Sequence, residues 1–351
     1  MRALYANAYV VVGDEAGTEH SRGWLLVDDG FVAETGAGEK PVADETVDLG
    51  GGLVTPGLVN THHHLYQTLT RARAQEADLF TWLKTLYPVW AGIDAESEHA
   101  AARTGLAELM LSGCTTVFDH HYLFPPGVEG LLEAEIQAAR ELGVRIVASR
   151  GSMDLGESRG GLPPDHVVEP TDGALAETES AELARRLGLG LHTHLAETIE
   201  EDAYCLELYG CRPVEYLERM GWLAEEVWCA HCVHLSGQDI SAFGDTGVGV
   251  AHCPTSNLRL GTRGGAAVLG RDDIGSLEPG NCADFAVWRT DGLEFGGADD
   301  PVAALVLSAP HRVDRLYVGG DEVVRDGRLV NADEDEIARE HRVQARRLWK
   351  Q

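Results

Sequence analysis

Histidines recur at the ends of several predicted strands, and their spacing is the most chemically suggestive feature of the sequence. The segment Asn60-Thr-His-His-His64 closes one apolar run, and alternation along an extended segment places His62 and His64 on the same face. His194 ends a later strand, within His192-Thr-His194. Because neutral imidazoles are common ligands of zinc and iron, this pattern predicts a divalent metal site.

Two further groups stand where they could move protons beside such a metal. A metal lowers the pKa of a bound water toward neutrality and makes it a hydroxide nucleophile, which then needs proton donors and acceptors. Glu197 follows His194 by three residues, and His231 ends the next strand. We expect Glu197 to protonate a ring nitrogen of the substrate and His231 to orient the attacking hydroxide. The alternative for Glu197 is a solvated acid at a helix start, since residues 200–202 are also acidic.

The elements that must position these residues alternate between apolar strands and helical stretches. Between the strands lie segments in which apolar residues recur at helical spacing, for example residues 95–111 and 130–142. This alternation predicts βα units around a parallel sheet, and barrels built in this way carry their active sites at the carboxyl ends of the strands. The six predicted strands are residues 53–60, 115–119, 145–149, 190–195, 227–232 and 247–252.

Both chain ends have a different, strand-rich character. Residues 1–52 contain short β-rich runs broken by glycine and aspartate, which are typical of a small antiparallel sheet. The pattern returns after residue 273, in residues 283–288, 315–318 and 322–325, and a terminal helix should begin near Asp333. We therefore expect residues 1–52 and 275–351 to form one composite β domain with a C-terminal helix, and residues 53–274 to form a barrel domain.

The composition narrows the class of protein. The 351 residues carry a formal charge of −29 that is spread along the chain, so binding to a phosphate backbone is not expected. No targeting signal and no apolar run of about 18 residues stands out, and we expect a cytoplasmic protein. The seven cysteines are scattered, which predicts reduced thiols. Cys229 and Cys232 form a CxxC within an apolar stretch, for which a structural role is favoured over a zinc site.

Several motifs along the chain belong together. They are Thr55-Pro-Gly-Leu-Val-Asn-Thr-His-His-His64, His192-Thr-His-Leu-Ala-Glu-Thr198, Ala230-His-Cys232, His252-Cys-Pro-Thr-Ser-Asn257 and Ile274-Gly-Ser-Leu-Glu-Pro-Gly-Asn-Cys-Ala-Asp284. Together they resemble the amidohydrolase superfamily over nearly the whole chain. The segments Leu65-Tyr-Gln67, Asp119-His-His-Tyr122 and Ala148-Ser-Arg-Gly-Ser-Met-Asp-Leu-Gly-Glu-Ser158 resemble its branch of heterocycle deaminases and triazine hydrolases. The last of these is most similar to the 8-oxoguanine deaminases.

This resemblance implies a fold, a reaction and a set of site residues. The fold would be a TIM-like (β/α) barrel with a small β-sandwich domain, and the enzyme would be a deaminase that uses one divalent ion, zinc or else iron. Its partner would be a small heterocyclic substrate. The residues with implied roles are the metal ligands His62, His64 and His194, the catalytic Glu197 and His231, and the substrate-binding Gln67 and Arg150.

Three further histidines have no role in this assignment. They are His63, His120 and His121. Because neighbouring positions on a strand face opposite ways, at most one of His120 and His121 can face the site. We favour a structural or supporting role for this pair.

The chain departs from the family's eight-stranded barrel at two places. Between residues 149 and 190 one helix, around residues 174–187, stands where two helices and a strand are expected, so strand four is missing. After Asn257 the eighth strand and its terminal aspartate are missing too. That aspartate would be a metal ligand and the first general base, so we expect impaired activity. Asp119 is the nearest acid at a strand end that could replace it. The unpaired strand edges need covering, which favours a homo-oligomer.

Three functions are compatible with these observations. The leading one is hydrolytic removal of an exocyclic amine from a purine-like ring by metal-bound hydroxide. A second is a non-catalytic descendant that keeps the metal and serves in binding or assembly, and a third is a triazine-type chlorohydrolase or aminohydrolase. The sequence has neither a glycine-rich phosphate loop nor a basic cluster at a strand end. We therefore expect the substrate to be a free base or neutral heterocycle rather than a nucleotide.

Overall fold

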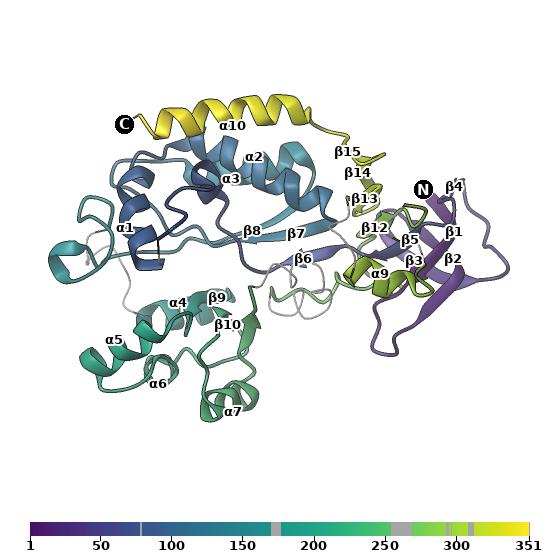
Figure 1. Ribbon diagram of the computed structural model, residues 1–351. Coiled ribbons are helices and arrows are strands. Elements are labelled where there is room, and N and C mark those ends of the chain that lie inside the picture. Colours follow the sequence, from purple (N-terminus) through teal and green to yellow (C-terminus); the bar gives the residue numbers. More distant parts are fainter. Residues whose placement is uncertain are drawn as a thin grey trace.

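The computed structural model describes residues 1–77, 79–169, 177–253, 269–292, 295, 297–307 and 312–350. Figure 1 shows a strand-rich part that contains the N-terminus beside a larger part in which helices surround parallel strands. Within the described residues no helix combines the length and the apolar character needed to cross a membrane.

Both chain ends build one nine-stranded sheet, in the order β15-β14-β13-β12-β5-β1-β2-β3 with β4 also paired to β1. β4 and β5 run parallel to β1, and every other pair is antiparallel, so the sheet is mixed where the sequence predicted an antiparallel one. Its strands are β1 (Arg2–Val11), β2 (Glu19–Asp28), β3 (Phe31–Ala37), β4 (Glu45–Asp48), β5 (Leu53–Pro56), β12 (Phe285–Trp288), β13 (Arg315–Val318), β14 (Asp321–Arg325) and β15 (Arg328–Leu329).

The run of residues 53–60, predicted as one strand, is two strands that belong to different sheets. β5 lies in the nine-stranded sheet, and β6 (Leu58–Asn60) begins the barrel. The break falls at Gly57, where an added Cβ would lie 2.2 Å from the Thr115 Oγ1 atom. Only glycine permits this close approach. One short apolar run therefore joins the small sheet to the barrel.

The barrel strands form two parallel sheets of three strands each. The first half-barrel contains β6, β7 (Cys114–Asp119) and β8 (Arg145–Ala148), and the second contains β9 (Leu191–Leu195), β10 (Val227–His231) and β11 (Gly249–Ala251). Among the described residues no strand pairing joins the two halves. They meet through side chains instead, because Phe118, Trp228 and Ala251 form one buried cluster.

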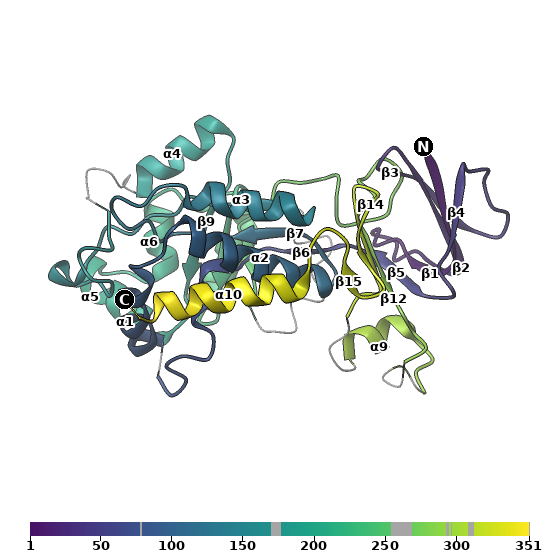
Figure 2. The same cartoon turned by 90° about the horizontal axis from the view of Figure 1, so that it is seen from above.

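Each half-barrel has its own helices (Figures 1 and 2). The first half-barrel carries η1 (Leu65–Thr70), α1 (Leu79–Trp90), α2 (Ala95–Leu111), α3 (Leu131–Leu142) and α10 (Glu334–Leu348). The second carries α4 (Glu177–Leu187), α5 (Ile199–Tyr209), α6 (Pro213–Arg219) and α7 (Gly237–Thr246), while α9 (Pro301–Leu307) lies beside the nine-stranded sheet. Between β8 and β9 the described residues contain η2 (Glu157–Arg159) and α4 but no strand.

The C-terminal helix connects the chain end to the first half-barrel. Asp333 caps α10 by accepting hydrogen bonds from the backbone N–H groups of Asp335 and Glu336. The helix runs along α2 (Figure 2), where the Gln344 side chain donates to Glu96 at 2.7 Å. The helix predicted near Asp333 is therefore present, and it covers α2. The segment after Asn257, where the sequence departs from the family's barrel, lies outside the described residues.

Candidate metal centre

Three histidines from the two half-barrels converge on one point. His62 and His64 follow β6, and His194 lies on β9. One ring nitrogen from each lies within 4.8 Å of those of the other two. The Nε2 atoms of His64 and His194 are 3.0 Å apart, and their rings stack with centroids 5.0 Å apart. The sequence-predicted ligands are thus brought together across the boundary between the half-barrels.

Hydrogen bonds around these rings determine which nitrogen can bind a metal. The Nδ1–H group of His64 donates to the His120 carbonyl at 2.9 Å, which leaves the lone pair of His64 on Nε2. His192 donates through Nδ1 to the Trp228 carbonyl at 2.9 Å, so its Nε2 accepts from His62 Nδ1 at 2.8 Å. The Nε2 atom of His62 is then also free. Metal-binding histidines typically have their other nitrogen held in this way.

The protonation state of the rings also suits a metal. Burial, followed by the neighbouring histidines, lowers the pKa of His62 and of His194. Burial lowers the pKa of His64 to about 3, although the hydrogen bond to His120 opposes that shift. The imidazoles are therefore neutral near pH 7, which is the form that donates a lone pair. The donor set fits a divalent zinc or iron ion.

Glu197 and His231 lie together at the edge of this cluster. The His231 Nε2 atom is 3.5 Å from Glu197 Oε1, and the His231 ring stacks on that of His194 with centroids 5.2 Å apart. Burial, with Glu201 adding to it, raises the pKa of Glu197, and burial lowers that of His231. Glu197 is half-buried rather than a solvated acid at a helix start. An acid that holds its proton longer beside a neutral imidazole is a suitable pair for proton transfer.

The backbone is unusual where these two residues are placed. Ala196 has φ of 50° and His231 has φ of 71°, in the left-handed region that residues other than glycine rarely adopt. Both residues lie where a parallel strand ends, and the turns aim Glu197 and His231 at each other. Such backbone strain is concentrated at functional sites.

Sequence reasoning left three nearby residues without a role. His192 holds His62, as described above, and the His120 ring lies 4.9 Å from the His194 ring. Cys253 joins His62 and His231 in a second group of potential ligands. The alternation in His192-Thr-His194 was a usable signal for His192, because it repeats the spacing of His62 and His64. His120 faces the cluster and His121 turns away from it, in agreement with the expectation that at most one of them faces the site.

The two predicted substrate-binding residues differ in their surroundings. Gln67 lies half-buried on η1, three residues after His64. Arg150 donates to Glu169 at 2.8 Å, and its guanidinium lies 3.9 Å from the centroid of the Phe124 ring. A substrate that binds Arg150 would therefore compete with Glu169 for its guanidinium group.

Asp119, the candidate replacement for the missing aspartate, does not join the histidine cluster. Its Oδ1 atom accepts a hydrogen bond from the Leu65 backbone N–H at 2.6 Å, and its Oδ2 atom lies 3.9 Å from His121 Nδ1. The side chain thus points to the other side of β7 from the metal ligands. It supports the segment that carries His64 rather than the metal.

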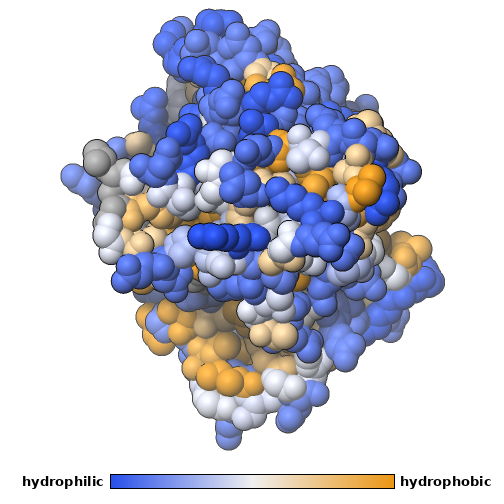
Figure 3. Space-filling view, turned by 90° about the vertical axis from the view of Figure 1, so that its right-hand side faces the viewer, coloured by the Kyte–Doolittle hydropathy of each residue, from blue (hydrophilic) through white to orange (hydrophobic). Residues whose placement is uncertain are grey.

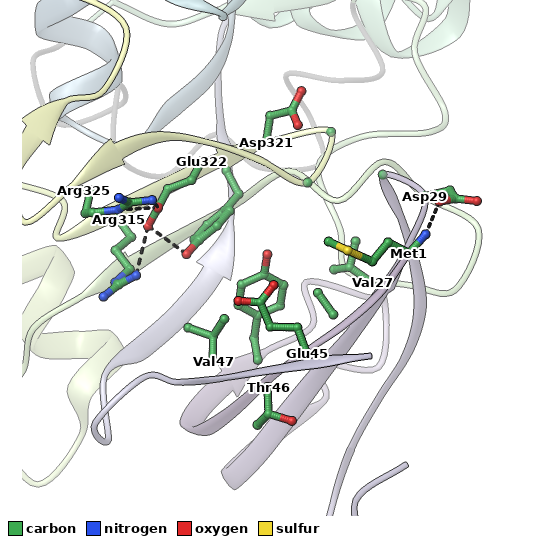
Figure 4. A pocket seen from close by; sticks show the side chains of 16 residues that line it. Met1, Val27, Asp29, Glu45, Thr46, Val47, Arg315, Asp321, Glu322 and Arg325 are labelled. Carbon is green, nitrogen blue, oxygen red and sulfur yellow. Dashed lines mark hydrogen bonds and ion pairs between the residues drawn. The ribbon is translucent and has the colours of Figure 1, made fainter. Parts of the chain in front are cut away.

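A separate pocket lies on the nine-stranded sheet (Figure 4). Arg315, Glu322 and Arg325 line one side, and Met1 and Asp29 lie on the other. Arg315 donates to Glu322 at 3.0 Å, so these two charges are paired with each other. No histidine lines this pocket, and it is distinct from the metal centre.

Comparisons with known proteins identify a matching family and several similar proteins. The profile of the Amidohydrolase family matches residues 53–263. The chain is 38% identical over 425 aligned positions to 8-oxoguanine deaminase of Pseudomonas aeruginosa, covering 93% of this chain and 95% of that protein. It is 30% identical to 5-methylthioadenosine/S-adenosylhomocysteine deaminase of Desulforudis audaxviator, with 99% of each covered. The crystal structure of atrazine chlorohydrolase from Arthrobacter aurescens TC1 complexed with zinc is similar, with a TM-score of 0.88, 27% identity, and 98% of this chain and 100% of that one covered.

Proposed function

The chain belongs to the amidohydrolase family and is a hydrolase of C–N bonds other than peptide bonds, and from this premise we propose that it deaminates a purine-like free base. The ring we favour is 8-oxoguanine or a close analogue, because the relative at 38% identity is an 8-oxoguanine deaminase. The observation that carries the proposal is the convergence of three neutral histidines beside a protonatable glutamate.

We infer that His62, His64 and His194 hold one divalent ion, zinc in the first instance and iron as the alternative. The fixed tautomers of His62 and His64, which leave the lone pair of each ring on Nε2, support this assignment. A similar solved structure is a zinc complex. When bound, the ion supplies Lewis-acid activation of water.

The protein side chains would then manage the protons. In the overall reaction, water adds to the ring carbon, the amino group takes up a proton, and the exocyclic C–N bond breaks so that ammonia leaves and a carbonyl remains. Glu197, with its raised pKa, can hold a proton at Oε1 for the ring nitrogen. His231, 3.5 Å away, can accept a hydrogen bond at Nε2 from the attacking water and orient it. Both residues belong to the second half-barrel, so this half would carry the proton chemistry.

Recognition of the substrate would fall to Gln67 and Arg150. Gln67 follows the ligand His64 on η1, and Arg150 follows β8. Because Arg150 is paired with Glu169, it is poorly available for a phosphate. We therefore propose that the substrate is a free base rather than a nucleotide. A nucleoside phosphate that turned over faster than its free base would contradict it.

We further infer that strands four and eight of the family's barrel are absent from this chain. The alignment with the Pseudomonas aeruginosa relative spans 425 positions whereas the chain has 351 residues, so that relative carries many residues without a counterpart here. The two unpaired parallel sheets in the described residues fit such an arrangement. Activity would be impaired by the loss of the strand-eight aspartate. The β-sandwich and the domain limits at residues 1–52, 53–274 and 275–351 stay predictions.

Two other functions each have a specific observation in their favour. The split between the half-barrels favours a non-catalytic metal protein that acts in binding or assembly. Similarity to an atrazine chlorohydrolase favours a triazine-type hydrolase. Exposed apolar side chains on the second half-barrel support a homo-oligomer with either function. The cytoplasmic location also stays a prediction.

The test is an ammonia-release assay on the zinc-loaded chain and, separately, on the iron-loaded chain. The panel contains 8-oxoguanine, guanine, isoxanthopterin, S-adenosylhomocysteine and an aminotriazine, and chloride release from atrazine is measured in parallel. We expect ammonia from 8-oxoguanine to appear fastest and to disappear in Glu197→Gln. Chloride or triazine turnover above that of every purine would favour the third function. No turnover of any ring by a folded, metal-loaded chain would favour the second.

A further inference from the structure

Four titratable side chains with 0% exposure meet behind the first half-barrel, on the other side of β7 from the metal centre. Glu98 comes from α2 and Glu135 from α3, while Asp119 and His121 stand at the end of β7. His121 Nδ1 lies 3.8 Å from Glu98 Oε1 and 3.9 Å from Asp119 Oδ2. One ligand atom each from Glu98, His121 and Glu135 lies within 4.8 Å of the others.

Six polar atoms of this cluster have no hydrogen-bond partner among the described residues. Both carboxylate oxygens of Glu98 and of Glu135 are buried and unpaired, and so are Asp119 Oδ2 and His121 Nδ1. Buried polar groups in proteins are nearly always paired, and an unpaired buried carboxylate is especially unfavourable. A group that the described side chains do not provide would therefore satisfy these atoms.

The tautomer of His121 indicates which kind of group would satisfy these atoms. Its Nε2–H group donates to the Leu123 carbonyl at 3.0 Å, so the lone pair is on Nδ1 and points toward the carboxylates. A ring whose other nitrogen is held by a backbone carbonyl is the usual arrangement of a metal-binding histidine. Lone pairs of a carboxylate and an imidazole repel each other unless a proton or a cation lies between them.

A proton shared between His121 and Glu98 does not account for the distance between them. Burial raises the pKa of Glu98 and of Glu135, so without a cation both would keep their protons. Each protonated carboxyl would still need an acceptor, but 3.8 Å between His121 and Glu98 is too long for a hydrogen bond. Ligands bound at about 2.1 Å in tetrahedral geometry lie roughly 3.4 Å apart, which is near the 3.8 Å between His121 Nδ1 and Glu98 Oε1.

We propose that Glu98, His121 and Glu135 form a second metal site, which takes a divalent first-row transition ion such as zinc. Two carboxylates and a neutral imidazole balance the charge of such an ion, and this mixture of ligands suits zinc, iron or manganese. The site is closed by the helices α2 and α3, so its ion is structural rather than catalytic.

This ion would stabilise the segment that positions the metal centre. The Oδ1 atom of Asp119 accepts from the backbone N–H of Leu65, the residue after the ligand His64. The His120 carbonyl, next to His121, accepts from His64 itself at 2.9 Å. Residues 119–121 therefore lie between the histidine cluster and the proposed second site. The buried ion would hold α2, α3 and β7 together around them.

The test counts zinc per chain after loading and removal of the excess. We expect two zinc ions in the unchanged chain, one in Glu135→Gln, and one in His64→Ala, which loses the other site. Glu133→Gln is the matched control, because Glu133 is exposed on the same helix and should leave two. One zinc in the unchanged chain, or two in Glu135→Gln, would overturn the second site.

A crystal of the zinc-loaded chain decides the matter if Glu135→Gln fails to fold. Anomalous scattering at the zinc edge should give a peak bonded to Glu98, Glu135 and His121 Nδ1. Zinc at the histidine cluster with no peak among these three residues would contradict the proposal.

Discussion

The two half-barrels have similar strands but differ in how many of their hydrophobic side chains are exposed. The first half-barrel, among its described residues, exposes two large hydrophobic side chains, Phe80 on α1 and Val343 on α10. The second half-barrel exposes many, and Figure 3 shows hydrophobic side chains gathered toward the bottom of the molecule, at the level of α7 in Figure 1. Those in the second half-barrel are Leu187, Leu189, Ile199, Tyr204, Leu206, Leu208, Tyr209, Val233, Ile240 and Val250.

The difference follows from what each half has to pack against. β6 of the first half-barrel continues from β5 of the nine-stranded sheet, and α10 from the chain end covers α2. The second half-barrel has no described strand joining it to the first. Yet each half contributes to the metal centre, since His62 and His64 come from one and His194 from the other. The histidine cluster is therefore a polar connection between a well-covered half and a poorly covered one.

The largest expected effect comes from removing a ligand on either side of this boundary. His64→Ala in the first half and His194→Ala in the second should each lose the catalytic ion and reduce ammonia release to background. Two remaining imidazoles bind a divalent ion weakly. Elemental analysis and the ammonia assay measure both effects, and His99→Ala, on the outer side of α2, is the control. Loss of metal and of activity in only one of the two variants would contradict a site shared by the two half-barrels.

The next effect concerns the proton chemistry assigned to the second half-barrel. Glu197→Gln should keep the metal and lower the rate by about 10²–10⁴-fold, the usual contribution of a general acid or base. Its exposed neighbour Glu200 provides the control variant Glu200→Gln, for which we expect an unchanged rate. A metal-loaded Glu197→Gln that retained full activity would remove this residue from the mechanism.

A smaller effect is expected from the histidine that holds a ligand across the boundary. His192→Phe removes the acceptor for His62 Nδ1 but keeps an aromatic ring beside Phe118 and Trp228. Loss of such a supporting group typically weakens metal affinity by about 10–100-fold. Competition with a chelator measures the affinity. Equal zinc affinities in His192→Phe and the unchanged chain would make His192 a packing residue only.

The smallest effect on stability is expected at the exposed apolar surface of the second half-barrel. Leu206→Ser with Leu208→Ser should change the free energy of unfolding by less than about 0.5 kcal/mol for each residue, because both side chains are exposed. The same change should reduce self-association in light scattering if copies of the chain cover this surface. Phe80→Ser in the first half-barrel is the control. An unchanged molar mass would place the interface elsewhere.

Much of the fold could be predicted because local patterns agree with the tertiary structure. α2 has the predicted bounds, since its apolar spacing is regular and Asp94 caps it by accepting from the Ser97 N–H. β13 also begins and ends where predicted. β4 was missed because it is a four-residue strand with mostly exposed side chains. The break at Gly57 depends on Thr115, a contact from far along the chain that no local pattern shows.

The site could be predicted only where strand alternation carries the signal. His62, His64 and His194 follow that alternation and do converge in the structure. The roles of His120 and His192 depend on which rings face one another across the half-barrels. Glu98 and Glu135 look like ordinary acids of surface helices, and their burial follows only from the packing of α2 against α3. Contacts that form only through tertiary packing cannot be predicted from the periodicity of the sequence.

The proposed function requires that a metal held between two incompletely joined half-barrels supports deamination, and does so slowly because the strand-eight aspartate is inferred to be absent. Its most direct test is the ammonia-release rate from 8-oxoguanine per catalytic metal ion. The chain is compared with a version in which the fourth strand and the eighth strand, ending in aspartate, are restored. General-base assistance typically contributes about 10²–10⁴-fold, so the restored chain should be faster by at least about 10²-fold. Equal rates per bound metal would contradict the claim.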